Sequence, residues 1–145
     1  MEYDRLGFSD LLVSRVAFGC EQLGGIDWGT YDRESVMLAV KRALDLGVNF
    51  FDTADVYALG GSEEALAEAL GESRRNVIIA TKVGVNWEMN RGAQRARTFL
   101  DLRPARVKQA LEESLPNRVT RGSFCAVENP PSLSASTTID LNFRI

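Results

Sequence analysis

Histidine is absent from the 145 residues of this chain, and cysteine occurs only twice, as Cys20 and Cys125. Without histidine, the sequence excludes histidine-dependent catalytic triads and the usual zinc sites, and we expect no metal centre. The two cysteines form neither a metal-binding pattern nor a disulfide framework. A reducing, cytoplasmic location is therefore the expected one.

Long apolar runs and a strong charge imbalance are also missing. No run reaches the ~18 apolar residues of a membrane span, and the N-terminus lacks a basic-then-apolar targeting signal. The formal net charge is −3 with both signs mixed along the chain, so neither a nucleic-acid nor a membrane surface is indicated. The length suffices for one domain with a real core, but a whole β/α barrel needs roughly 200 residues or more.

Two apolar stretches typical of buried strands end in polar residues. The run over residues 48–51 follows the helix stop Gly47, and Asp52 stands where this strand should end. Tyr57 lies in the next loop, and a second such strand ends at Lys82. In a β/α barrel, the carboxyl ends of the strands face the active site, so we expect Asp52, Tyr57 and Lys82 to converge there.

This set of side chains suits proton transfer to a carbonyl oxygen. An ammonium beside a phenol stabilises the phenolate, and an aspartate holds the ammonium in place, which makes Tyr57 the candidate proton donor. A structural interpretation stays open beside it. In that case Asp52 bonds loop amides, Tyr57 covers the barrel rim and Lys82 is a solvated strand terminus.

Strand and helix patterns alternate along most of the chain, which favours parallel strands joined by right-handed crossovers. We expect a β-hairpin over residues 1–14, then three adjacent parallel strands over 16–19, 48–52 and 77–81. Each strand should be followed by an outer helix, with the helix starts marked by Asp32, Ser62 and Pro104. The apolar positions Val36, Ala39, Val40, Ala43 and Leu44 predict the buried face of the first helix.

Two segments break this pattern. Residues 83–102 form a long connection that we interpret as a solvated loop. The alternative is that its arginines, Arg91, Arg95 and Arg97, contact a substrate or phosphate. Residues 116–136 show neither helical nor strand periodicity, and they contain the breaker Asn129-Pro130-Pro131. We therefore expect a barrel-like part over residues 1–115 and an irregular, divergent tail over 116–145. Residues 139–141 have a short strand-like pattern, so a displaced fourth strand stays open there as an alternative.

Seven short motifs, taken in order and with their spacing, resemble the aldo-keto reductase family from about residue 5 to residue 115. They are Arg5-Leu6-Gly7, Ala17-Phe18-Gly19-Cys20, Ala43-Leu44-Asp45-Leu46-Gly47, Phe51-Asp52-Thr53-Ala54 with Tyr57, Gly61-Ser62-Glu63-Glu64, Ala80-Thr81-Lys82 and Ala110-Leu111-Glu112-Glu113-Ser114-Leu115.

The resemblance implies the N-terminal half of a (β/α)8 TIM barrel, with three to four parallel strands, that reduces a small aldehyde or ketone with NADPH. Tyr57 would be the catalytic acid, assisted by Lys82 and Asp52. The backbone near Cys20 and Glu21 would approach the nicotinamide ribose, and Asp52 completes the cofactor-binding set.

The family also uses a histidine, and its later barrel loops hold most of the cofactor. We therefore expect impaired activity. The alternative is a non-catalytic fragment or interaction protein that associates with itself through exposed strand edges.

Overall fold

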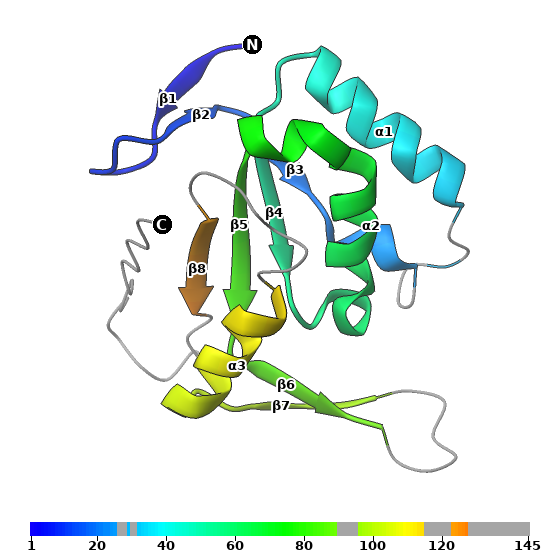
Figure 1. Cartoon of the computed structure of the whole chain (residues 1–145), viewed down its shortest axis with the longest axis vertical. Coiled ribbons are helices and arrows are strands. Elements are labelled where there is room, and N and C mark those ends of the chain that lie inside the picture. Colours follow the sequence, from blue (N-terminus) through cyan, green and yellow to red (C-terminus); the bar gives the residue numbers. More distant parts are fainter. Residues whose placement is uncertain (26–28, 30–31, 90–95, 115–122, 128–145) are drawn as a thin grey trace.

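A central sheet of four parallel strands organises the molecule (Figure 1). The computed structural model describes residues 1–25, 29, 32–89, 96–114 and 123–127, the last five for the backbone alone. The strand order is β3-β4-β5-β8, with bounds Phe18–Gly19, Phe50–Ala54, Ile78–Val83 and Ser123–Val127. The three parallel strands predicted from the sequence are confirmed as neighbours in chain order.

Two helices, α1 (Arg33–Asp45) and α2 (Gly61–Leu70), cover one face of this sheet (Figure 1). The apolar core lies between them and the strands. Phe51 at its centre is fully buried, and its ring centroid lies 5.6 Å from that of Phe18 on the neighbouring strand. Because side chains alternate along a strand, Phe51 and Thr53 face the helices while Asp52 faces the other side. The predicted site residues of β4 and β5 therefore point away from the core.

The limits of α1 follow the local sequence. The Asp32 carboxylate accepts a hydrogen bond from the backbone N–H of Ser35 at 3.0 Å and caps the helix. Gly47 follows the helix with φ 85°, which suits a residue without a Cβ. On the predicted face Val40 and Ala43 are buried, but Ala39 is exposed. Because a helix turns about 100° per residue, Ala39 lies at the margin of the buried face that contains Val40.

The start of α2 differs from the prediction. Gly60, with φ 96°, is the N-cap, because the short 3-10 turn η2 (Tyr57–Gly60) runs directly into the helix. Ser62, predicted to cap α2, lies inside its first turn, where its hydroxyl donates to the carbonyl oxygen of Cys20. The Ser62 prediction is therefore wrong, and its hydroxyl links α2 to the residue that follows β3.

An antiparallel hairpin precedes the sheet, as predicted. It consists of β1 (Tyr3–Arg5) and β2 (Leu12–Ser14). Asn49, just before β4, donates to the carbonyl oxygen of Leu12 at 2.9 Å and accepts from the N–H of Ser14 at 2.6 Å. The hairpin is thus attached at the amino end of β4, away from Asp52.

A second hairpin occupies the connection that we interpreted as a solvated loop. It pairs β6 (Val85–Glu88) with β7 (Arg97–Leu100). Both stretches contain β-favouring aromatic or branched residues, Trp87 among them, and pairing satisfies their backbone groups. The N–H of Asp101 donates to the carbonyl oxygen of Gly84 at 2.9 Å and closes the hairpin base.

The last described helix, α3 (Pro104–Ser114), begins at Pro104 as predicted. Beyond it, β8 pairs in parallel with the edge of β5, so the expectation of an irregular segment over 116–136 is wrong for Ser123–Val127. Serine, proline and asparagine surround the β-favouring residues of β8, so the local sequence does not predict this strand. The strand forms because the open edge of β5 offers it a partner. The alternative of a displaced strand at 139–141 lies outside the described residues.

Three short 3-10 turns complete the described elements. They are η1 (Glu21–Gly24), η2 (Tyr57–Gly60) and η3 (Gly71–Asn76). Within the part of the chain that the structure describes, no helix is both long and apolar enough to cross a membrane.

Candidate active site

Asp52 and Lys82 meet on the face of the sheet opposite α1 and α2. The register pairs Asp52 with Ala80 and Ala54 with Lys82, so the two charged side chains share a face and lie two positions apart. The Lys82 Nζ atom lies 2.8 Å from Asp52 Oδ2 and 3.3 Å from the carbonyl oxygen of Thr53. The Lys82 side chain is only 21% exposed, which limits solvent screening of this ion pair.

Tyr57 reaches the same point from the turn that follows β4. Tyr57 is half-buried and is the first residue of η2. The centroid of its ring lies 5.0 Å from Lys82 Nζ. This distance is within the range of a cation–π contact. The structure therefore brings Asp52, Tyr57 and Lys82 together, as the sequence predicted, while the catalytic role of each remains a prediction.

The backbone after Tyr57 is strained. Ala58 and Leu59 have φ values of 50° and 55°, a left-handed conformation that costs about 1–2 kcal/mol per residue other than glycine. Gly24 of η1 packs against this turn so closely that a Cβ on Gly24 would overlap the Cβ of Ala58. The turn that carries Tyr57 is thus held in an unusual conformation by contact with η1.

The environment of Lys82 favours its charged form. Burial by itself would lower the Lys82 pKa, but hydrogen bonding to Asp52 and then to Tyr57, together with the charges of these two groups, raises it above its ordinary value. Lys82 is therefore an ammonium at neutral pH, and its positive charge is available to the phenol. A small hollow opens at this point, and Asp55, Tyr57, Lys82 and Val85 are among the residues that line it.

The predicted cofactor contacts differ in accessibility. Cys20 has no exposed surface, and its N–H donates to the carbonyl oxygen of Asp52 at 2.9 Å. Burial, followed by the Asp52 charge, raises the pKa of the Cys20 thiol to about 12. Glu21 is exposed at the start of η1, so Glu21 and Asp52 are the predicted cofactor contacts that present side-chain surface.

A buried acidic residue near the site was missed in the sequence. Glu63, only 5% exposed, accepts hydrogen bonds from the hydroxyls of Thr81 (2.9 Å) and Ser114 (3.2 Å). It thereby joins α2, β5 and α3. The sequence did contain a signal, because Thr81 occupies a helix-facing position of a buried strand, where its hydroxyl needs a partner.

A buried ion pair was missed as well. The Arg106 Nη2 atom on α3 lies 3.1 Å from Asp55 Oδ2, and both side chains are 8% exposed. The guanidinium also lies 5.6 Å from the ring centroid of Trp87. No local sequence signal pointed to it, because the stripe of Arg106, Ala110 and Ser114 shows itself as the buried face of α3 only in the structure.

Comparison with known sequences decides the family. The pattern described as "Aldo/keto reductase family" matches residues 15–120. The chain belongs to the aldo/keto reductase family. It is 33% identical over 117 residues to the aldo-keto reductase YhdN of Bacillus subtilis, which covers 79% of this chain and 34% of the relative. It is 50% identical over 74 residues to the uncharacterized oxidoreductase Rv2298 of Mycobacterium tuberculosis, covering 49% of this chain and 23% of the relative.

Solved structures of aldo/keto reductases are similar to this chain as well. The glycerol dehydrogenase AKR11B4 of Gluconobacter oxydans matches with a TM-score of 0.76 and 34% identity, over 90% of this chain and 40% of that one. The holo form of the aldo-keto reductase AKR11C1 of Bacillus halodurans matches with a TM-score of 0.73 and 32% identity, over 88% and 40%. The chain therefore spans between 23% and 40% of the length of these relatives. Its parallel strands and outer helices form part of a (β/α)8 barrel.

Aldo/keto reductases are oxidoreductases that generally use NAD(P)H, and the donor set of this chain fits one end of that cofactor. The Asp52 carboxylate keeps 42% of its side-chain surface exposed while Oδ2 accepts from Lys82. A carboxylate has about four acceptor positions, so Asp52 retains capacity for a ribose hydroxyl beside the nicotinamide. A ribose hydroxyl held there would lie next to the Lys82 ammonium and the Tyr57 ring.

Proposed function

We propose that this chain carries the proton-donating part of a site that reduces an aldehyde or ketone with NADPH. The observation that supports this function is the placement of the Lys82 ammonium between the Asp52 carboxylate and the Tyr57 ring. A solvated strand terminus would not need two partners at this point. The small carbonyl substrate would lie beside Tyr57 and Lys82.

In the proposed reaction, the Tyr57 hydroxyl donates its proton to the carbonyl oxygen of the substrate. The O–H bond of the phenol breaks, and the Lys82 ammonium stabilises the phenolate that remains. NADPH, when bound, supplies the hydride that completes the alcohol. Asp52 keeps Lys82 oriented through their 2.8 Å contact. General acid assistance of this kind typically contributes about 10²–10⁴-fold to a rate.

The cofactor contacts proposed for this chain are Glu21, Asp52 and the backbone near Cys20, and they would serve the nicotinamide ribose. By resemblance to the family, the later barrel loops hold the rest of NADPH. We therefore propose weak NADPH binding by the 145-residue chain and a correspondingly low activity. Positioning of reactants can contribute roughly 7–11 kcal/mol to catalysis, so loss of a positioned cofactor should outweigh retention of Tyr57.

The test measures NADPH binding and NADPH oxidation with an activated aldehyde, for the chain and for its Tyr57→Phe variant. We expect weak binding and equal, background rates for both proteins. Robust turnover that Tyr57→Phe abolishes would show a working enzyme and overturn the proposed impairment. Robust turnover that survives Tyr57→Phe would instead overturn the role of Tyr57.

A second candidate function is a non-catalytic interaction protein, favoured by the absence of histidine from the whole sequence. The outer strands of the described sheet, β3 and β8, offer edges for pairing with a second copy of this chain. Light scattering after size-exclusion chromatography tests this self-association, and a monomer at all concentrations would count against it. We propose a cytoplasmic location in either case, in keeping with the free Cys20 thiol.

A further inference from the structure

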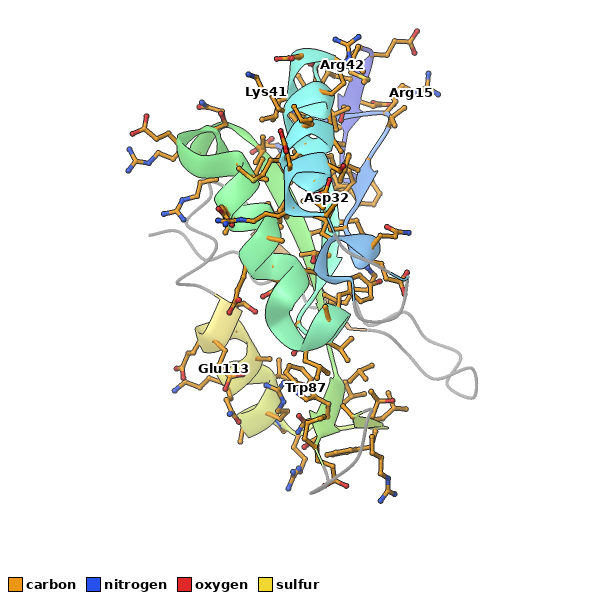
Figure 2. The ribbon with its side chains drawn as sticks, turned by 90° about the vertical axis from the view of Figure 1, so that its right-hand side faces the viewer. Arg15, Asp32, Lys41, Arg42, Trp87 and Glu113 are labelled. Carbon is orange, nitrogen blue, oxygen red and sulfur yellow. The ribbon has the colours of Figure 1, made fainter. Side chains whose placement is uncertain are left out.

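Arg106 on α3 links three elements that meet beside the candidate active site. Its guanidinium forms the buried 3.1 Å contact with Asp55, lies over the ring of Trp87 and is 3.4 Å from the Glu113 carboxylate. Figure 2 shows Trp87 on β6 beside α3, which carries Glu113. Removing one partner from a buried ion pair is strongly unfavourable because the other charge stays behind. Arg106 is therefore firmly held.

Asp55 connects Arg106 to the predicted proton donor. It immediately follows β4, and its N–H donates to the carbonyl oxygen of Lys82 at 3.3 Å. Asp55 also lines the same hollow as Tyr57 and Lys82. Only Val56 separates Asp55 from Tyr57, so the ion pair anchors the chain where it enters the strained turn. On the other side of Tyr57, contact between Gly24 and Ala58 anchors the exit.

We infer that Arg106 is a positioning residue that, through Asp55, holds the Tyr57 phenol against the Lys82 ammonium. This inference rests on the proposed function only for the role of Tyr57. The contacts of Arg106 are with Asp55, Glu113 and Trp87, and not with Tyr57 or Lys82. Its effect should pass through the short segment from Asp55 to Tyr57.

The Lys82 ammonium is a direct probe of where Tyr57 lies, because contact with Tyr57 is one of the causes that raise the Lys82 pKa. The titratable groups that raise it are Asp52 on β4 and Tyr57 on η2, while Asp55 lines the hollow beside it. The sequence contains three lysines, Lys41, Lys82 and Lys108. Selective ¹³C labelling of lysine therefore gives three side-chain signals, which Lys41→Arg and Lys108→Arg assign.

The experiment follows the Lys82 signal by NMR against pH in the 145-residue chain and in Arg106→Gln and Asp55→Asn. If the pair positions Tyr57, both substitutions release the phenol, and both lower the Lys82 pKa by roughly half a unit or more, toward its value in Tyr57→Phe. If only charge matters, the two substitutions act in opposite directions. Loss of the Arg106 cation then raises the Lys82 pKa, and loss of the Asp55 anion lowers it.

Opposite shifts, or no shift in either variant, would overturn the inference. Lys108→Gln is the matched control, because Lys108 lies on the exposed side of α3, 3.8 Å from Glu112, and should leave Lys82 unchanged. If Arg106→Gln fails to fold, Asp55→Asn decides the question in the Tyr57→Phe background. Positioning requires its effect to vanish there, whereas a charge effect persists. Because no step depends on turnover, a failed proposed function and a failed positioning role give different results.

Discussion

The Lys82 ammonium lies 2.8 Å from the Asp52 carboxylate, across the two central strands of the sheet. The parallel register gives both residues the same face and leaves them two positions apart. A long lysine side chain spans this offset, and it then also reaches the ring of Tyr57. The ion pair thus connects the barrel scaffold with the predicted proton donor.

Lys82 should contribute to stability in a pH-dependent way. Its folded-state pKa is raised above the ordinary value of 10.5, so its contribution is fully present below the unfolded-state pKa and is lost as pH rises through the folded-state pKa. We therefore expect the free-energy difference between wild type and Lys82→Met to shrink above about pH 10.5. Urea unfolding at a series of pH values measures it. The exposed Lys41→Met serves as control, and a difference independent of pH would contradict the prediction.

Glu63 should be essential to the packing of α2 against β5 and α3. Replacing it with alanine leaves the buried hydroxyls of Thr81 and Ser114 without their carboxylate. An unsatisfied buried polar group costs about 1–3 kcal/mol, so we expect Glu63→Ala to lower the free energy of unfolding by at least that amount. Its exposed neighbour Glu64 gives the matched control, since surface substitutions usually stay within about 0.5 kcal/mol. Equal effects of the two alanines in denaturant titrations would refute a structural role for the Glu63 carboxylate.

Much of the scaffold could be predicted because local signals and packing agree in the first half of the chain. Asp32 and Gly47 mark the limits of α1 in both sequence and structure. The apolar runs before Asp52 and Lys82 likewise indicated the site. The predicted strand ends were wrong by two residues, because β4 continues to Ala54 and β5 to Val83.

The features that could not be predicted from the sequence depend on interactions between distant segments. Strand β8 forms against the edge of β5, and Ser62 uses its hydroxyl on Cys20 instead of on its own helix. The Arg106–Asp55 pair joins residues far apart in the sequence, and no local pattern encodes such a partner.

Gly24 should be required for the conformation of the turn after Tyr57. A methyl group at this position would overlap the Cβ of Ala58, and overpacking of this kind typically costs about 1–3 kcal/mol. We expect Gly24→Ala to lower the thermal midpoint clearly. Gly19→Ala is the control, because a Cβ there would meet nothing within 4 Å. Calorimetry or circular dichroism measures the thermal midpoints. Equal midpoints for the two variants would show that the turn adjusts freely.

The Cys20 thiol should be inert in the folded chain although the cysteine lies next to the candidate site. Its pKa is raised to about 12, chiefly by burial, and a thiolate is required for attack on a disulfide reagent. We expect a Cys125→Ser variant to show almost no reaction with an aromatic disulfide at about pH 8, where an ordinary thiol of pKa ≈ 8.5 reacts readily. In denaturant the same variant should release one reporter per chain, and Cys20→Ser with Cys125→Ser should release none. Since a buried thiol reacts only when the structure opens, rapid labelling of the native variant would mean that the segment between β3 and η1 is open. The hydrogen bond from the Ser62 hydroxyl to the Cys20 carbonyl oxygen would then be broken in solution.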